Sequence, residues 1–99
     1  MIPNLSRAQL ERLSLLLEEL GETQQAIGKV LRHGFESKHP RRPRGLSNRE
    51  MLAVECGDIL AALDLLVSAN DLDDDLIGRS RMKKHKTVRQ YLHHQPSDP

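Results

Sequence analysis

Five carboxylates in two short segments are the residues of this chain best suited to metal chemistry. They are Glu18, Glu19, Glu22, Glu55 and Asp58. Glu19 and Glu22 are three positions apart, as are Glu55 and Asp58, so each pair projects from one side of a helix. If the two helices pack antiparallel, which the connecting segment permits, the two pairs can converge.

Converging carboxylates repel one another and raise each other's pKa unless a cation lies between them. A site that offers only oxygen ligands suits Mg²⁺ or Mn²⁺ rather than zinc. The alternative is that these residues are solvated acids on amphipathic helices. One pair alone would favour that alternative, whereas two pairs that both border apolar faces leave the two interpretations about equally matched.

Five basic residues are candidates for binding phosphate beside such a metal ion. Magnesium held by carboxylates usually keeps waters and meets substrate phosphates, and phosphate groups favour nearby cations. The candidates are Lys29, Arg32, Lys83, Lys86 and Arg89. The alternative for each of them is a solvated helix surface.

The first acidic segment belongs to a predicted helix from about Ser6 to Arg32. Ser6 and Gln9 have the spacing of a capping box, and Gly34 is suited to end the helix. Apolar residues recur at three- and four-residue spacing, which predicts one apolar face. We call this set the leucine stripe, and it comprises Leu10, Leu13, Leu17, Leu20, Ile27 and Leu31.

A loop is predicted over residues 35–46, because Pro40, Pro43 and Gly45 interrupt regular structure. The loop is strongly basic. Its positively charged residues and its histidine are Lys38, His39, Arg41, Arg42 and Arg44. Three roles stay open for it: a lid over a substrate, a contact to nucleic acid, or a solubilising linker.

The second acidic segment lies on a predicted helix that opens with a capping box at Ser47 and Glu50 and runs to about Ala69. Its apolar face is wide and comprises Leu52, Cys56, Ile59, Leu60, Leu63, Leu66 and Val67. Cys56 is expected to be a small core residue rather than a nucleophile, because no histidine flanks it. The face is broader than a two-helix hairpin can cover, so we expect contacts between subunits.

A third helix is predicted from Asp73 to about His93, and residues 94–99 are expected to form a disordered tail. The 99 residues therefore predict one small all-α domain over residues 1–93, with three main helices. A chain this short buries only part of its surface alone, which is a second reason to expect oligomerisation.

Composition excludes several classes of partner. The net charge is +1, and Phe35 and Tyr91 are the only aromatic residues, so the base-stacking surfaces of single-strand binders are not expected. No apolar run approaches the roughly 20 residues that span a bilayer, so no membrane partner is expected. Cys56 is the only cysteine, which fits a reducing cytoplasm.

The two acidic segments, in this order, resemble the EExxE…ExxD pattern of the MazG-like all-α nucleoside triphosphate pyrophosphohydrolases. The likeness covers about residues 13–70 and continues more weakly to Arg89. The segments that follow each motif, residues 26–34 and 57–62, agree with it. The spacing between the motifs is longer than the family's commonest form because of the basic loop. The short chain and residues 32–35 look most like phage-type members, among them the MazZ group, which processes guanine nucleotides.

The resemblance implies a four-helix-type core that is completed by assembly into a homodimer or homotetramer. It also implies Mg²⁺-dependent hydrolysis of a (deoxy)nucleoside triphosphate to the monophosphate and pyrophosphate, with dGTP or GTP as the substrate if the chain is MazZ-like. Glu19, Glu22, Glu55 and Asp58 would be the metal ligands, and Glu18 would be a further ligand or would orient the attacking water. The implied location is the cytoplasm, and the host cytoplasm if a phage encodes the chain.

Two other functions compete with an enzyme. The first is a helical module that binds nucleic acid through its basic loop and third helix. This is disfavoured, because five carboxylates at the edge of the core would repel phosphate in the absence of metal. The second is a catalytically silent assembly subunit with the same fold.

Overall fold

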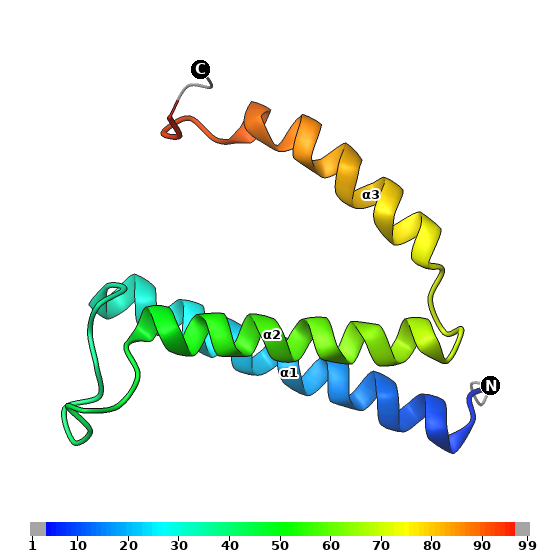
Figure 1. Ribbon diagram of the computed structural model, residues 1–99, viewed down its shortest axis with the longest axis horizontal. Coiled ribbons are helices and arrows are strands. Elements are labelled where there is room, and N and C mark those ends of the chain that lie inside the picture. Colours follow the sequence, from blue (N-terminus) through cyan, green and yellow to red (C-terminus); the bar gives the residue numbers. More distant parts are fainter. Residues whose placement is uncertain (1–3, 97–99) are drawn as a thin grey trace.

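The computed structural model describes residues 4–96, which form three α-helices and one short 3₁₀ helix (Figure 1). The helices are α1 (Arg7–His33), α2 (Asn48–Ser68), α3 (Asp74–Thr87) and η1 (Val88–Tyr91). Among residues 4–96 there is no β-strand. The predicted all-α class with three main helices is confirmed.

The ends of α1 and the start of α2 follow the predicted capping signals. The Ser6 hydroxyl accepts a hydrogen bond from the Gln9 backbone N–H at 3.1 Å, and the Gln9 side chain accepts one from the Ser6 N–H at 2.8 Å. Ser47 and Glu50 make the same reciprocal pair at 3.2 and 3.0 Å. Gly34 ends α1 with φ of 88°, a conformation that glycine adopts without steric penalty.

A Schellman motif ends α2 and turns the chain toward α3. Asn70 has φ of 61°, the left-handed conformation that asparagine tolerates better than most residues. The Asp71 N–H donates to the Leu66 carbonyl at 2.9 Å, and the Asn70 N–H donates to the Val67 carbonyl at 3.0 Å. The chain therefore leaves α2 in a defined direction rather than through a loose linker.

The third helix is shorter than the sequence predicted. Asp73 caps it as expected, but the α-helix ends at Thr87 and gives way to the 3₁₀ helix η1 instead of continuing to His93. Thr87 and Val88 are β-branched and propagate an α-helix poorly. In the predicted tail, residues 94–96 have no helix or strand. Residues 1–3 and 97–99 lie outside the described part of the chain.

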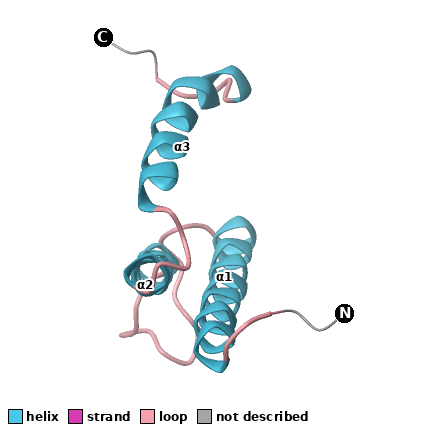
Figure 2. Cartoon of the chain, turned by 90° about the vertical axis from the view of Figure 1, so that its right-hand side faces the viewer, coloured by secondary structure: helices cyan, strands magenta, loops and turns pink. Residues whose placement is uncertain are grey.

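The hairpin of α1 and α2 is antiparallel (Figure 1), and most of the residues that its two helices bury are small. Thr23 and Ala26 of α1 are buried, as are Ala62 and Leu66 of α2. Short side chains at a helix crossing let the two backbones approach closely. α3 extends away from this hairpin and buries none of its residues (Figure 2).

The leucine stripe does not face α2. Its six members are between 42 and 81% exposed, with Leu31 at the upper end. A helix can bury only one side against a single neighbour, and here that side is the one with Thr23, Ala26 and Glu19. The prediction that Cys56 is a core residue is wrong for the same reason: it is exposed, because α2 turns the strip containing Glu55 and Ala62 toward α1.

The chain exposes much more surface than a compact monomer of its size. Its accessible area is 8790 Å², whereas about 5,700 Å² is expected from a mass of 11.2 kDa. Its radius of gyration is 17.3 Å, compared with about 13 Å for a compact 100-residue domain. Within residues 4–96, no helix has both the length and the apolar character needed to span a bilayer.

Candidate metal centre

The predicted carboxylates meet near the middle of the hairpin. Glu19 comes from α1, and Glu55 and Asp58 come from α2. One carboxylate oxygen from each of the three lies within 4.8 Å of the others. Glu19 and Glu55 are half-buried and Asp58 is exposed. The antiparallel packing thus brings together residues that are 36 or more positions apart in the sequence.

Two of these carboxylate oxygens are buried without a hydrogen-bond partner among residues 4–96. They are Oε2 of Glu19 and Oε2 of Glu55. A buried carboxylate oxygen without a donor loses its hydration and gains nothing in return, so such atoms are rare in folded proteins. A positively charged ligand would satisfy both atoms.

Burial and mutual repulsion disfavour the ionised form of the acids on α1. Desolvation raises the pKa of Glu19, and the neighbouring charges of Glu22, Asp58, Glu55 and Glu18 raise it further. Desolvation likewise raises the pKa of Glu22, with Glu55 as the next cause. A divalent cation would reverse both effects, because it supplies the opposite charge that the cluster lacks.

Glu22 extends the cluster toward the closed end of the hairpin. It lines a small depression of about 260 Å³ together with Glu55, Lys29, Asn48 and Met51. Glu18 is exposed one helical turn before Glu22, and its charge contributes to the raised pKa of Glu19. The structure therefore brings Glu19, Glu55 and Asp58 together, and Glu18 and Glu22 lie beside this group without belonging to it.

The ligand chemistry of the cluster suits magnesium, although its oxygens would have to move closer together. All of its ligand atoms would be carboxylate oxygens, the type that Mg²⁺ prefers. Two Mg²⁺ ligands on opposite sides of the ion lie about 4.2 Å apart, twice the usual bond length of 2.0–2.1 Å. At most one of the three pairs can lie on opposite sides of the ion, and neighbouring ligands of an octahedron are about 2.9 Å apart. Separations of up to 4.8 Å would therefore have to close by as much as about 1.9 Å when the ion binds.

The predicted phosphate-binding residues divide into two groups. Lys29 and Arg32 lie on the last turns of α1, beyond the acids, and line a pocket of about 580 Å³ under the basic loop. The other three residues, Lys83, Lys86 and Arg89, lie on α3 and η1. Because α3 extends away from the hairpin, this single chain does not bring them to the carboxylates (Figures 1 and 2).

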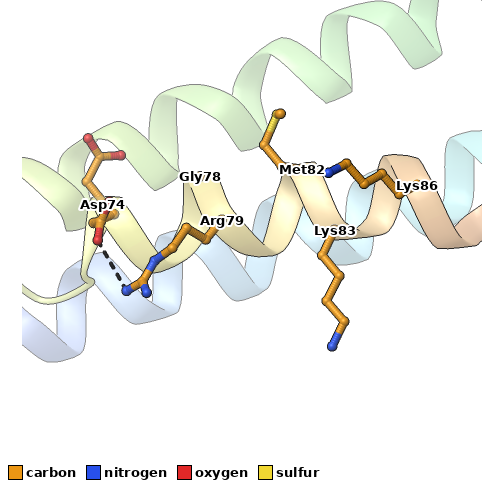
Figure 3. A pocket seen from close by; sticks show the side chains of 7 residues that line it. Asp74, Gly78, Arg79, Met82, Lys83 and Lys86 are labelled. Carbon is orange, nitrogen blue, oxygen red and sulfur yellow. Dashed lines mark ion pairs between the residues drawn. The ribbon is translucent and has the colours of Figure 1, made fainter.

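The α3 residues instead line an open depression of their own. Lys83 and Lys86 share it with Asp74, Asp75 and Arg79. Figure 3 shows the side chains of Lys83 and Lys86 pointing in different directions. An ion pair of 3.2 Å joins Arg79 to Asp75, but both side chains are largely exposed, so it stabilises α3 only weakly.

Two features of the site region were not predicted from the sequence. One is the pocket under the basic loop, because the loop's fold depends on contacts between residues far apart in sequence. The other is the ion pair of Arg12 and Asp71, whose two contacts measure 2.6 and 3.2 Å. It ties α1 to the turn before α3. The block of aspartates at residues 71–75 was the only sequence signal for it.

Comparison with known proteins gives no match: no family model, no curated protein and no solved structure is significantly similar to the chain. The likeness to the MazG-like pattern is therefore confined to the two acidic motifs and the segments that follow them.

Proposed function

We propose that the protein is a Mg²⁺-dependent pyrophosphohydrolase that acts on a nucleoside triphosphate. The observation that carries the proposal is the convergence of Glu19, Glu55 and Asp58 around two buried, unpartnered carboxylate oxygens. A cluster of this kind is destabilising in a purely structural role and useful for holding a cation. The basic residues at the closed end of the hairpin support a phosphate-containing substrate.

Glu19, Glu22, Glu55 and Asp58 would hold the metal ion. When bound, Mg²⁺ polarises phosphate oxygens and offsets the negative charge that develops on them during hydrolysis. Glu18 is exposed to solvent beside the cluster, and it would orient the attacking water and accept its proton. Lys29 lines the depression that contains Glu22 and Glu55 and would attract the phosphates.

Assembly with further copies of the chain is part of the proposal. The surface in excess of a compact monomer is roughly 3,000 Å² per chain. Two copies that covered it would bury an area at or above the upper end of obligate interfaces. A homodimer or homotetramer would complete a four-helix-type core and could bring Lys83, Lys86 and Arg89 of one copy to the carboxylates of another.

Release of pyrophosphate from each of the eight common NTPs and dNTPs, in the presence of Mg²⁺, tests the proposal directly. If the MazZ-like resemblance holds, dGTP or GTP is the preferred substrate. Absence of pyrophosphate release from every nucleotide would refute an enzymatic role and favour a silent assembly subunit. The single cysteine and a nucleotide substrate suit a cytoplasmic location.

Variants of the cluster separate the site from the rest of the surface. Glu22→Gln and Asp58→Asn should each abolish pyrophosphate release and leave the helical content unchanged. Glu11→Gln on α1 and Asp64→Asn on α2 are matched controls, since both residues are exposed acids outside the cluster. Full activity in either cluster variant would contradict the assigned site.

The alternative of a nucleic-acid-binding module has one observation in its favour. α3 carries Lys83 and Lys86 and buries none of its residues, so its cations are accessible. Tight, strongly salt-dependent DNA binding without any nucleotide hydrolysis would favour this alternative.

A further inference from the structure

The loop that connects α1 to α2 is a folded element. The Asn48 N–H donates to the Ser37 carbonyl at 2.9 Å, and the Arg49 N–H donates to the Phe35 carbonyl at 2.8 Å. Lys38 and Ser47 form an isolated antiparallel bridge just beyond these bonds. A single stem of backbone pairs therefore holds the two ends of the loop together.

Side chains reinforce this stem. The Asn48 amide donates to the Gly34 carbonyl at 3.1 Å. Arg49 pairs with Glu36 at 2.7 Å and lies 4.3 Å from the centre of the Phe35 ring. Residues at the tip then turn back on themselves, because the Arg42 N–H donates to the His39 carbonyl and the Gly45 N–H donates to the Arg42 carbonyl, both at 2.9 Å.

The folded loop covers a pocket of about 580 Å³ whose lining is rich in positive charge. Lys29 and Arg32 contribute from α1, and Lys38 and Arg42 contribute from the loop. No carboxylate lines this pocket, and none of the ion pairs found among residues 4–96 involves these four cations. The charge of Lys38 helps to lower the pKa of Glu50. The Glu50 carboxylate, however, accepts a hydrogen bond from the Ser47 N–H as part of the capping box.

Four cations around one pocket repel each other, so an anion with several charges is the ligand that such an arrangement binds best. Arginine and lysine both bind phosphate well, and arginine does so with two parallel hydrogen bonds. The volume falls in the range of small-molecule sites. A phosphate chain therefore fits both the charge and the size of the pocket.

The pocket adjoins the carboxylate cluster. Lys29, Asn48 and Met51 line both this pocket and the smaller depression that contains Glu22 and Glu55. Glu22 and Lys29 are seven residues apart on α1, which corresponds to about 10 Å along the helix axis. A ligand that reaches from one depression to the other passes Lys29.

We propose that the pocket under residues 35–46 binds a polyphosphate chain, namely the terminal phosphates of the nucleotide or the pyrophosphate released from it. The assignment of the phosphate chain to the substrate or product rests on the proposed function. The existence of an anion site in the pocket does not depend on it. The basic loop is then part of the substrate site rather than a solubilising linker.

Binding of inorganic pyrophosphate to the full chain, measured by calorimetry in buffer without divalent metal, tests the anion site without any need for catalysis. The double variant Lys38→Ala/Arg42→Ala should weaken binding at least tenfold. Arg41→Ala/Arg44→Ala is the matched control, because it removes the same charge from the same loop at positions that do not line the pocket. It should change binding less than twofold.

No binding of pyrophosphate by the wild-type chain, or equal weakening in both double variants, would overturn the proposal. Tighter binding of a DNA oligonucleotide, lost equally in both double variants, would also overturn it. Arg32→Gln removes a lining cation from α1 instead of the loop and should also weaken pyrophosphate binding. Circular dichroism checks that each variant keeps its helices.

Kinetics distinguishes the two sources of the phosphate chain. If the pocket holds the substrate's own phosphates, the Lys38→Ala/Arg42→Ala variant raises the KM for the nucleotide at least tenfold. If it holds only released pyrophosphate, KM stays constant and inhibition by added pyrophosphate weakens. Pocket-dependent binding of pyrophosphate without hydrolysis of any nucleotide would refute the proposed function and leave the anion site standing.

Discussion

Shortening two leucines of the exposed stripe should dissociate the protein into monomers. Leu17 and Leu31 are 73 and 81% exposed and lie about 40° apart around α1, so both belong to one surface. The perturbation is the double variant Leu17→Ala/Leu31→Ala. Alanine is the best helix former, so α1 itself should be preserved.

The expected magnitude follows from the exposed fractions. Complete burial of a leucine side chain contributes about 1.5–3 kcal/mol, so covering the three quarters still exposed here would contribute about 1–2 kcal/mol for each residue. A symmetric dimer contains four such side chains, which gives about 4–8 kcal/mol for the interface. At 1.4 kcal/mol per factor of ten, the dissociation constant should rise by about a thousandfold or more.

Sedimentation equilibrium over a range of protein concentrations measures this change. The double variant Glu11→Ala/Ser14→Ala serves as the control, because both residues are exposed on α1 outside the leucine stripe. It should leave the mass unchanged. A wild-type chain that is monomeric at 100 μM would refute the reasoning, and so would a leucine variant with the same dissociation constant as the wild type.

Three further outcomes are expected. Mg²⁺ at ten times its Kd stabilises a protein with one metal site by about 1.4 kcal/mol. In differential scanning fluorimetry it should therefore raise the Tm of the wild type by roughly 6–11 °C and leave the Tm of Glu55→Gln unchanged. The hydrogen bond from Arg12 lowers the pKa of Asp71, so the stability from this pair is present above the ordinary pKa of 3.8 and is lost as pH falls through the lower folded value. In urea titrations below about pH 4, the free energy of unfolding should therefore fall less steeply with decreasing pH in Asp71→Asn than in the wild type. Leu66 is fully buried, and Leu66→Ala should reduce the free energy of unfolding by about 2–5 kcal/mol in urea, with no reduction refuting its place in the core.

Features determined by neighbouring residues were predictable from the sequence. The capping boxes at Ser6 and Ser47 and the glycine end of α1 depend on side chains that reach only a few positions along the chain. The pairing of Glu19 with the acids of α2 was also predictable, since the connecting residues 34–47 permit the two helices to pack antiparallel.

Features that depend on which neighbour a helix meets were not predictable. Periodicity identifies the apolar face of each helix but does not say which side of the helix faces its neighbour. The side of α1 with Thr23 and Ala26 packs against α2 in place of the leucine stripe, because short side chains allow closer packing. Cys56 was expected in the core because it lies on the wide apolar face of α2, but on that face Leu66 is buried, whereas Cys56 and Leu60 are exposed. The predicted end of α3 lay too far along the chain, because no neighbouring element among residues 4–96 packs against this helix and stabilises further turns.

The stem of the loop holds the two helices together, so the residues at the tip of the loop are not needed for that purpose. Hydrogen bonds at Gly34, Phe35 and Ser37 close the stem before the chain reaches residues 39–46. Because the free energy of closing a loop depends only weakly on its length, these tip residues can be exchanged, shortened or extended with little effect on the hairpin. The tip of the loop can therefore change in sequence and length, and with it the ligand that this end of the molecule would prefer, while the carboxylates on the helices stay in place.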